Sequence, residues 1–264
     1  MPNALSYTLM TRRKFVPALA AGGALMSQAQ SKPPSIYEIR TVYLRNTLDN
    51  ESGRLREFLQ HAALPALTRA GIGPIGFFSP VIATDSPFVM TIFSYPSLAA
   101  MEQQRAALSA DAEFAKAFAA YNAQPASDHP RIDSMLVRAF PAVPTIEIPD
   151  SKAGHIFEMR RYESNTAATL ARKIKMFESG EIDIFRKLGM NPVFFAETIV
   201  GPRMPNLTYM LSFNDLASRE KCWKAFGSDP DWQKIRSAPG NSDAEIVSNI
   251  SNWILAPLPF SQIR

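Results

Sequence analysis

An internal repeat constrains the fold of this chain more than any other feature of its sequence. Ile36-Tyr37-Glu38-Ile39-Arg40 recurs as Ile156-Phe157-Glu158-Met159-Arg160, at an offset of 120 residues. Three further blocks recur at an offset of 118: residues 71–75 as 189–193, 94–99 as 212–217, and 109–114 as 227–232. A nearly constant offset over four blocks is not expected by chance, so we predict two copies of one structural unit.

Hydrophobic periodicity predicts the same order of elements in each copy. The expected strands are 37–43, 74–82, 88–95 and 135–140 in the first copy, and 157–162, 192–200, 207–213 and 253–258 in the second. The expected helices are 55–67 and 98–105, then 170–185 and 216–226. Gly71 and Gly189 are predicted to end the first helix of each copy, and Ser97 and Asp215 to cap the start of the second.

The order β-α-β-β-α-β is the ferredoxin-like arrangement, so the predicted fold class is α+β. We place the first unit at residues 35–140 and the second at 155–264, joined by a proline-rich linker at 141–154. The sheets of the two units are expected to pair as an α+β barrel. Both units lie in one chain, so the barrel needs no second molecule, although a homodimer stays open as a further assembly.

The first 29 residues are typical of a twin-arginine signal peptide. Arg12 and Arg13 precede a short apolar run at 18–26, and small residues lead to a predicted cleavage after Ala29. The apolar run is too short to span a bilayer, and no other long apolar run is present, so no stable membrane span is expected. We therefore predict a bacterial protein that is periplasmic or otherwise exported and that meets the twin-arginine translocase during export.

Removal of this segment changes the charge of the protein. The full chain has 28 basic and 24 acidic residues, and residues 1–29 hold three of the basic residues and none of the acidic ones. The mature chain is then nearly neutral, so nucleic acid is not a predicted partner. The single cysteine, Cys222, and three scattered histidines lack the spacing of a metal site, and no metal or cofactor is predicted. The sequence leaves open whether translation starts at Met1 or Met10.

The second copy carries five recognisable motifs. In chain order they are Phe157-Glu158-Met159-Arg160-Arg161-Tyr162, Phe185 to Met190, Tyr209-Met210-Leu211, Ala217-Ser218-Arg219-Glu220-Lys221-Cys222-Trp223 and Asp229-Pro230-Asp231-Trp232. Together they resemble the pattern of the NIPSNAP family, and the first copy resembles it more weakly. The resemblance implies the dimeric α+β barrel fold but no single activity. A histidine common in the first helix of the family is present as His61 in the first copy and is missing from 179–185 in the second.

Charged residues on the opening strand of each copy are the first candidates for a functional site. If the odd-numbered residues of 37–43 face the helices, Glu38 and Arg40 face the barrel interior, as do Glu158 and Arg160 in the second copy. Buried charges need partners. Structural ion pairs across the two sheets are therefore the favoured interpretation, and a role in orienting a ligand is the alternative.

Tyr162, Tyr209 and His61 complete the set of candidate ligand-binding residues. The tyrosines could wall an apolar pocket, although aromatic residues on strands more often belong to the core. His61 enters the set through the family resemblance.

The leading functional hypothesis is an exported protein that binds a small, largely apolar molecule in the barrel interior. The second hypothesis, which rests on fold analogy alone, is a cofactor-independent enzyme of the monooxygenase or isomerase type. The third is a structural or interaction scaffold whose barrel is filled by side chains. The presence and position of a cavity distinguish the first two hypotheses from the third.

Overall fold

The computed structural model describes residues 32–124, 131–149 and 155–264 of the chain. The predicted signal peptide, with Arg12, Arg13 and the cleavage after Ala29, lies outside the described residues. Within the described residues, no helix is long and apolar enough to cross a membrane.

Each predicted unit folds as one repeat. The first repeat comprises β1 (Ile36–Tyr43), α1 (Glu51–Phe58), the π-helical turn η1 (Leu59–Ala63), α2 (Leu64–Arg69), β2 (Ile75–Ile82), β3 (Phe88–Tyr95), α3 (Leu98–Ser109), α4 (Ala112–Asn122) and β4 (Arg131–Ala139). The second comprises β5 (Ile156–Glu163), α5 (Ala167–Met176), η2 (Phe177–Glu181), α6 (Ile182–Lys187), β6 (Asn191–Val200), β7 (Asn206–Phe213), α7 (Leu216–Ser228), α8 (Pro230–Arg236), α9 (Asp243–Ile246) and β8 (Asn249–Pro257).

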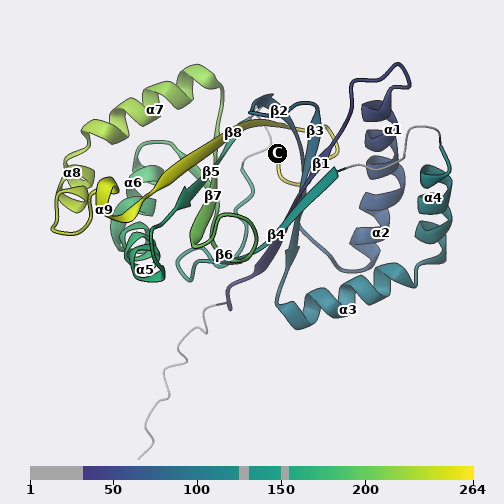
Figure 1. Ribbon diagram of the computed structural model, residues 1–264, viewed down its shortest axis with the longest axis horizontal. Coiled ribbons are helices and arrows are strands. Elements are labelled where there is room, and N and C mark those ends of the chain that lie inside the picture. Colours follow the sequence, from purple (N-terminus) through teal and green to yellow (C-terminus); the bar gives the residue numbers. More distant parts are fainter. Residues whose placement is uncertain (1–31, 125–130, 150–154) are drawn as a thin grey trace, which may run out of the picture. The chain divides into compact units, whose positions relative to one another are not determined.

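The eight strands form one closed antiparallel barrel, which confirms the predicted α+β class and the pairing of the two sheets (Figure 1). The strand order is β1-β3-β2-β8-β5-β7-β6-β4, so each repeat supplies four strands. Two pairings between repeats close the barrel: β2 with β8, where Phe78 meets Pro257, and β4 with β6, where Ala139 meets Ala196. Closure gives each of these strands a neighbour on both sides.

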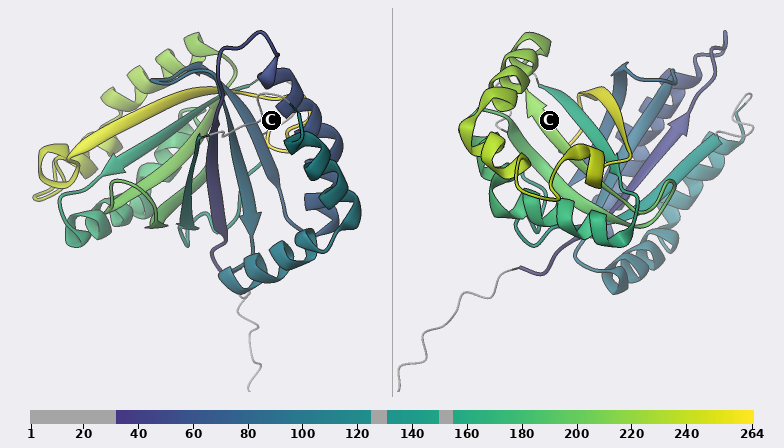
Figure 2. Two further views of the ribbon diagram at one scale, coloured as in Figure 1. Left: turned by 45° about the vertical axis from the view of Figure 1, so that its right-hand side comes forward. Right: turned by 60° about the vertical axis from the view of Figure 1, so that its left-hand side comes forward.

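The helices pack on the outer faces of the two sheets (Figure 2), so each sheet has a buried side toward the helices and another toward the barrel axis. Every strand contributes apolar residues to the interior; examples in sequence order are Tyr37, Phe78, Met90, Val137, Phe157, Phe194, Met210 and Leu255. In each repeat, one further apolar cluster lies between the sheet and the helices that cover it. The middle of the barrel is therefore a packed core.

The predicted helix ends are confirmed in both repeats. The side chain of Ser97 accepts a hydrogen bond from the backbone N–H of Ala100, and Asp215 accepts one from Ser218 at 2.6 Å. Gly71 and Gly189, directly after the first helical stretch, have φ of 77° and 74°, a conformation that side-chain-bearing residues rarely adopt.

The structure differs from the prediction at the helix after β3 and in the linker. The predicted helix 98–105 extends to Ser109, and a further helix, α4, follows it. The described part of the linker packs against the barrel, because Val143 and Ile146 are buried and the Glu147 N–H donates to the Val193 carbonyl at 2.9 Å. The described part of the linker thus takes part in the apolar packing, with Ile146 in the barrel interior and Val143 in the cluster of the second repeat.

Candidate functional site

The predicted orientation of Glu38, Arg40, Glu158 and Arg160 was wrong. Their odd-numbered neighbours, including Tyr37, lie in the barrel interior, and the four charged side chains face the helices. Strand alternation shows which residues share a face but not which face meets the helices. The interior offers mainly apolar side chains, whereas helices α3 and α7 supply the arginines that a buried carboxylate needs.

Glu38 anchors an ion cluster in the first repeat. Its carboxylate accepts hydrogen bonds from Arg40 Nε at 2.6 Å, from Arg105 on α3, and from the Tyr95 hydroxyl at 3.3 Å. Burial, with the nearby Glu38 charge, raises the pKa of Tyr95 to about 12, so this hydroxyl stays protonated as a donor. Arg40 and Arg105 keep 37% and 39% of their side-chain surface exposed, so solvent shares in stabilising them.

Glu158 anchors the corresponding cluster in the second repeat, and this cluster is drier. The carboxylate accepts from Arg160 Nη1 at 2.9 Å, from Arg219 Nη2 at 2.6 Å and from Trp223 Nε1 at 2.6 Å. The Glu158 side chain is fully buried and that of Arg160 is 13% exposed. Ion pairs thus form in both repeats, but they link each glutamate to its own strand and to a helix instead of crossing the barrel between the two sheets, and helix α7 supplies two partners that the prediction did not include.

The strand registers define which residues of the two repeats are equivalent. Thr91 lies opposite Arg40 in the β1–β3 pair, and Tyr209 lies opposite Arg160 in the β5–β7 pair. Thr91 and Tyr209 are therefore equivalent, at the repeat offset of 118. The same offset relates η1 to η2, and the residues of the first and second repeats then correspond as follows: Leu55 to Lys173, Leu59 to Phe177, Ala63 to Glu181 and Leu67 to Phe185.

The first repeat has a cavity of about 260 Å³ between its sheet and its helices. Its walls are mostly apolar, with Leu59, Leu67 and Phe114 among them, and Glu38, Arg40 and Arg105 contribute the charged part of the lining. Thr91 also lines it, and the buried Thr91 Oγ1 has no hydrogen-bond partner among the described residues. Unsatisfied buried hydroxyls are uncommon, because a lost hydrogen bond costs free energy.

Larger side chains fill the equivalent space in the second repeat. The Tyr209 hydroxyl donates to the Tyr162 hydroxyl at 2.9 Å, and the Tyr209 ring stacks on Phe185 and Phe195. Lys173 Nζ lies 3.2 Å from a Glu181 carboxylate oxygen, with side chains 1% and 2% exposed. Burial raises the pKa of Glu181 above its ordinary value, and Lys173 opposes that shift.

The remaining predicted residues are placed differently. Tyr162 and Tyr209 belong to the apolar core cluster of the second repeat. His61 is largely exposed on η1, and its Nε2 lies 3.4 Å from Glu57. No group of three or more His, Cys, Asp or Glu that could hold a metal ion occurs among residues 32–124, 131–149 and 155–264.

Thr91 and Arg105 were missed because neither belongs to a recognisable motif. A comparison of equivalent positions could have found Thr91, since a small residue stands there where the second repeat has Tyr209. The same comparison does not single out Arg105. Its equivalent at the same offset is Trp223, and both side chains donate to the buried glutamate of their repeat. The two repeats thus use different residue types on α3 and α7 to donate to the buried glutamate.

Comparison with known proteins supports this architecture. The model of the NIPSNAP family matches residues 37–143 and again residues 157–262, once in each repeat. No match is found among curated proteins.

Two solved structures of similar fold span both repeats, and a third corresponds to less than half of the chain. A provisionally assigned monooxygenase from Lactobacillus acidophilus is 12% identical, with a TM-score of 0.56 over 85% of this chain and 94% of that chain. Another, from Fusobacterium nucleatum, is 8% identical, with a TM-score of 0.56 over 86% and 93%. A NIPSNAP family protein from Agrobacterium tumefaciens is 22% identical, with a TM-score of 0.39, and covers 46% of this chain and 100% of its own. At these identities the first two likenesses show the fold alone.

Proposed function

Because the chain belongs to the NIPSNAP family and its two repeats close one barrel, we propose that the protein binds a small, largely apolar molecule in the first repeat. The site is the cavity between the sheet and the helices, outside the packed barrel interior. The observation that carries the proposal is the contrast between the repeats: one unit of the same fold is filled by aromatic residues, and the other keeps an open space.

The size and lining of the cavity indicate the ligand class. An apolar cavity of about 150 Å³ is enough to bind benzene, and this one is about 260 Å³. A bicyclic aromatic molecule, or an aliphatic one of similar volume, therefore suits it. The unpaired Thr91 hydroxyl favours a ligand with one hydroxyl or carbonyl group, because the ligand then satisfies a buried polar atom.

The hydrogen bonds of Glu38 favour ligand binding over proton transfer as the role of this site. A general base must have a lone pair available to the reacting molecule, whereas the roughly four acceptor sites of this carboxylate already meet four donors, namely the two arginines, Ser134 and Tyr95. Its contacts hold the two arginines at the cavity, where their N–H groups can meet a polar ligand atom. The fold likeness to monooxygenases does not by itself extend an activity to this chain.

Thr91→Phe is expected to abolish binding of 1-naphthol, which we choose as a probe with an apolar bicyclic body and one hydroxyl. The phenyl ring occupies the cavity, as Tyr209 occupies the equivalent space in the second repeat. Isothermal titration calorimetry should give one binding site on the wild-type chain and none on the variant. Leu67→Phe, which places the equivalent of Phe185 in the first repeat, fills the cavity from the helix side and should weaken binding independently.

Tyr209→Phe is the matched control, because it places the same residue at the equivalent position of the other repeat. It should leave 1-naphthol affinity unchanged. Undiminished binding to folded Thr91→Phe and Leu67→Phe chains would place the ligand elsewhere and overturn the proposed site.

We also propose that the protein is exported through the twin-arginine route. The support is the arginine pair at Arg12 and Arg13, the apolar run that follows, and the small residues before Ala29. Expression of the full chain in a bacterium should give a periplasmic protein whose first residue is Gln30. Replacement of both arginines by lysine should retain the uncleaved protein in the cytoplasm, and unaltered export of that variant would contradict the route.

A further inference from the structure

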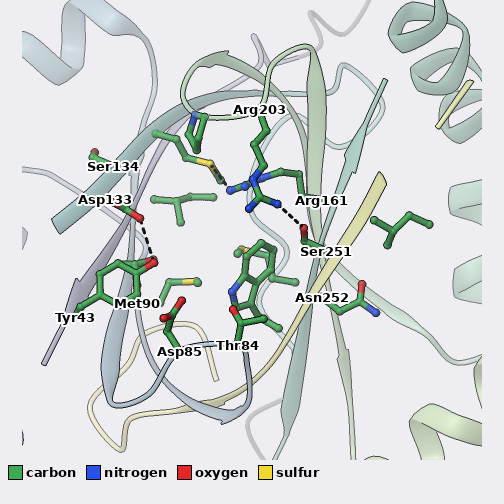
Figure 3. Close-up of a pocket in the computed structure, with 17 residues that line it drawn as sticks. Tyr43, Thr84, Asp85, Met90, Asp133, Ser134, Arg161, Arg203, Ser251 and Asn252 are labelled. Carbon is green, nitrogen blue, oxygen red and sulfur yellow. Dashed lines mark hydrogen bonds between the residues drawn. The ribbon is translucent and has the colours of Figure 1, made fainter. Parts of the chain in front are cut away.

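A second pocket, of about 490 Å³, opens at one end of the barrel (Figure 3). It is built by both repeats, because its walls come from the ends of β1 and β5, the starts of β4 and β8, and the β2–β3 and β6–β7 loops. It is distinct from the cavity of the first repeat, which lies on the other face of the sheet.

Arg161 is the unusual residue of this pocket. It continues the interior-facing series of β5 after Phe157 and Met159, and only 8% of its surface is exposed. Its Nη2 contacts the sulfur of Met135 at 3.4 Å, and its Nε finds no hydrogen-bond partner in the described part of the chain. Among the residues that the structure describes, no carboxylate forms an ion pair with it. A buried cation without an anionic partner is costly.

The charges around Arg161 compensate its positive charge only in part. Burial lowers the pKa of Arg161 and the neighbouring positive charge of Arg203 adds to that effect, while the negative charges of Glu163 and Asp133 oppose it. Arg203 itself reaches Glu163 and Ser251 only at 3.4 Å. In Figure 3 the two arginines lie together on one side of the pocket, with Tyr43 and Asp133 on the other. An anion between the arginines would relieve both effects.

The rest of the pocket limits what this anion can be. Much of the lining is polar, and Met90, Met159 and Trp253 are among its apolar side chains, so an apolar portion of the ligand has a surface to contact. Asp85 and Asp133 stand on the opposite wall, where a second negative charge on the ligand would be repelled. A guanidinium group matches a carboxylate in a planar, two-bond geometry.

We propose that the barrel-end pocket binds an amphiphilic monocarboxylate, with the carboxylate on Arg161 and Arg203 and the apolar portion against the methionines and Trp253. This site is independent of the cavity in the first repeat. It gives the barrel a second binding site to which each repeat contributes one wall.

Calorimetry with octanoate tests this site, with 1-octanol as a probe of the same length that lacks the charge. Octanoate should bind wild-type protein more tightly than 1-octanol. Arg161→Met should weaken octanoate binding about 10- to 100-fold, since a charge-assisted hydrogen-bond pair is lost, and should leave 1-octanol binding nearly unchanged. Arg236→Gln, which removes an exposed arginine on α8, is the matched control and should have no effect.

Stability gives a second measurement. Loss of an arginine that serves the fold would destabilise the chain. Loss of Arg161 should not, because its partners among the described residues are the Trp253 ring, 5.3 Å from the guanidinium, and the Met135 sulfur, and neither compensates its charge as an anion would. Unliganded Arg161→Met is therefore expected to melt at or above the wild-type temperature. Thr91→Phe should still bind octanoate, and Arg161→Met should still bind 1-naphthol, so the two sites can fail separately. Unchanged octanoate affinity in Arg161→Met, or tighter binding of octyl phosphate than of octanoate, would overturn the assignment.

Discussion

Glu158→Gln should destabilise the protein by about 3–5 kcal/mol, because it leaves buried arginine charge without a counter-ion. The carboxylate is fully buried and accepts from Arg160, Arg219 and Trp223. Glutamine has nearly the same shape, so the loss reports charge more than packing. Arg160 is too buried for water to compensate it.

The equivalent change in the first repeat, Glu38→Gln, should cost only about 1–2 kcal/mol. Its partners, Arg40 and Arg105, are each more than one-third exposed and remain solvated when the carboxylate charge is removed. Urea unfolding of both variants, with the midpoint and the slope compared with wild type, measures the difference. Equal losses in the two repeats would show that burial of the arginines does not set the cost.

Tyr209→Thr should open a cavity in the second repeat at the position equivalent to that of the first, with a large loss of stability and a gain of binding. Removal of a buried aromatic ring costs roughly 3–5 kcal/mol, part of it from the cavity left behind. That cavity lies among Phe177, Phe185 and Tyr162, where the structure is now filled. The variant should bind a second equivalent of 1-naphthol.

Ligand should also recover part of the lost stability. At a free concentration 100 times the dissociation constant, one bound ligand contributes about 2.7 kcal/mol. Thermal unfolding of Tyr209→Thr with and without 1-naphthol measures this recovery. In the control variant Tyr209→Phe, which keeps the ring and loses only the hydroxyl bond to Tyr162, the expected cost is about 1 kcal/mol and no second ligand should bind. A stable Tyr209→Thr chain that binds no additional ligand would contradict the equivalence of the two spaces.

The fold was predictable from the sequence because its determinants are local and repeated. Helix ends depend on local backbone geometry and not on distant contacts. Two helices begin at the capping residues Ser97 and Asp215, and two helical stretches end at Gly71 and Gly189. The offset of 118–120 residues then indicated that the same elements occur twice. Closure of the barrel was predicted because the sheets of two such units usually pair face to face.

The position of the candidate site was not predictable in the same way. Alternation along β1 correctly grouped Glu38 with Arg40, but the choice of face depends on which partners the helices bring, and Arg105 is 67 residues away from Glu38. The cavity arises from several small differences between the repeats, such as Thr91 in place of Tyr209, and no single residue marks it. The unsatisfied Nε of Arg161 is likewise visible only once its neighbours in the described part of the chain are known.

The central claim is that the first repeat holds an open apolar cavity between its sheet and its helices, and that Tyr209 and its neighbours fill the equivalent space in the second repeat. A crystal structure of the wild-type protein under xenon pressure tests it most directly, because xenon enters apolar cavities of this size. The structure predicts xenon beside Thr91, between the first sheet and its helices, and none beside Tyr209. Xenon at both equivalent positions, or at neither, would contradict the claim.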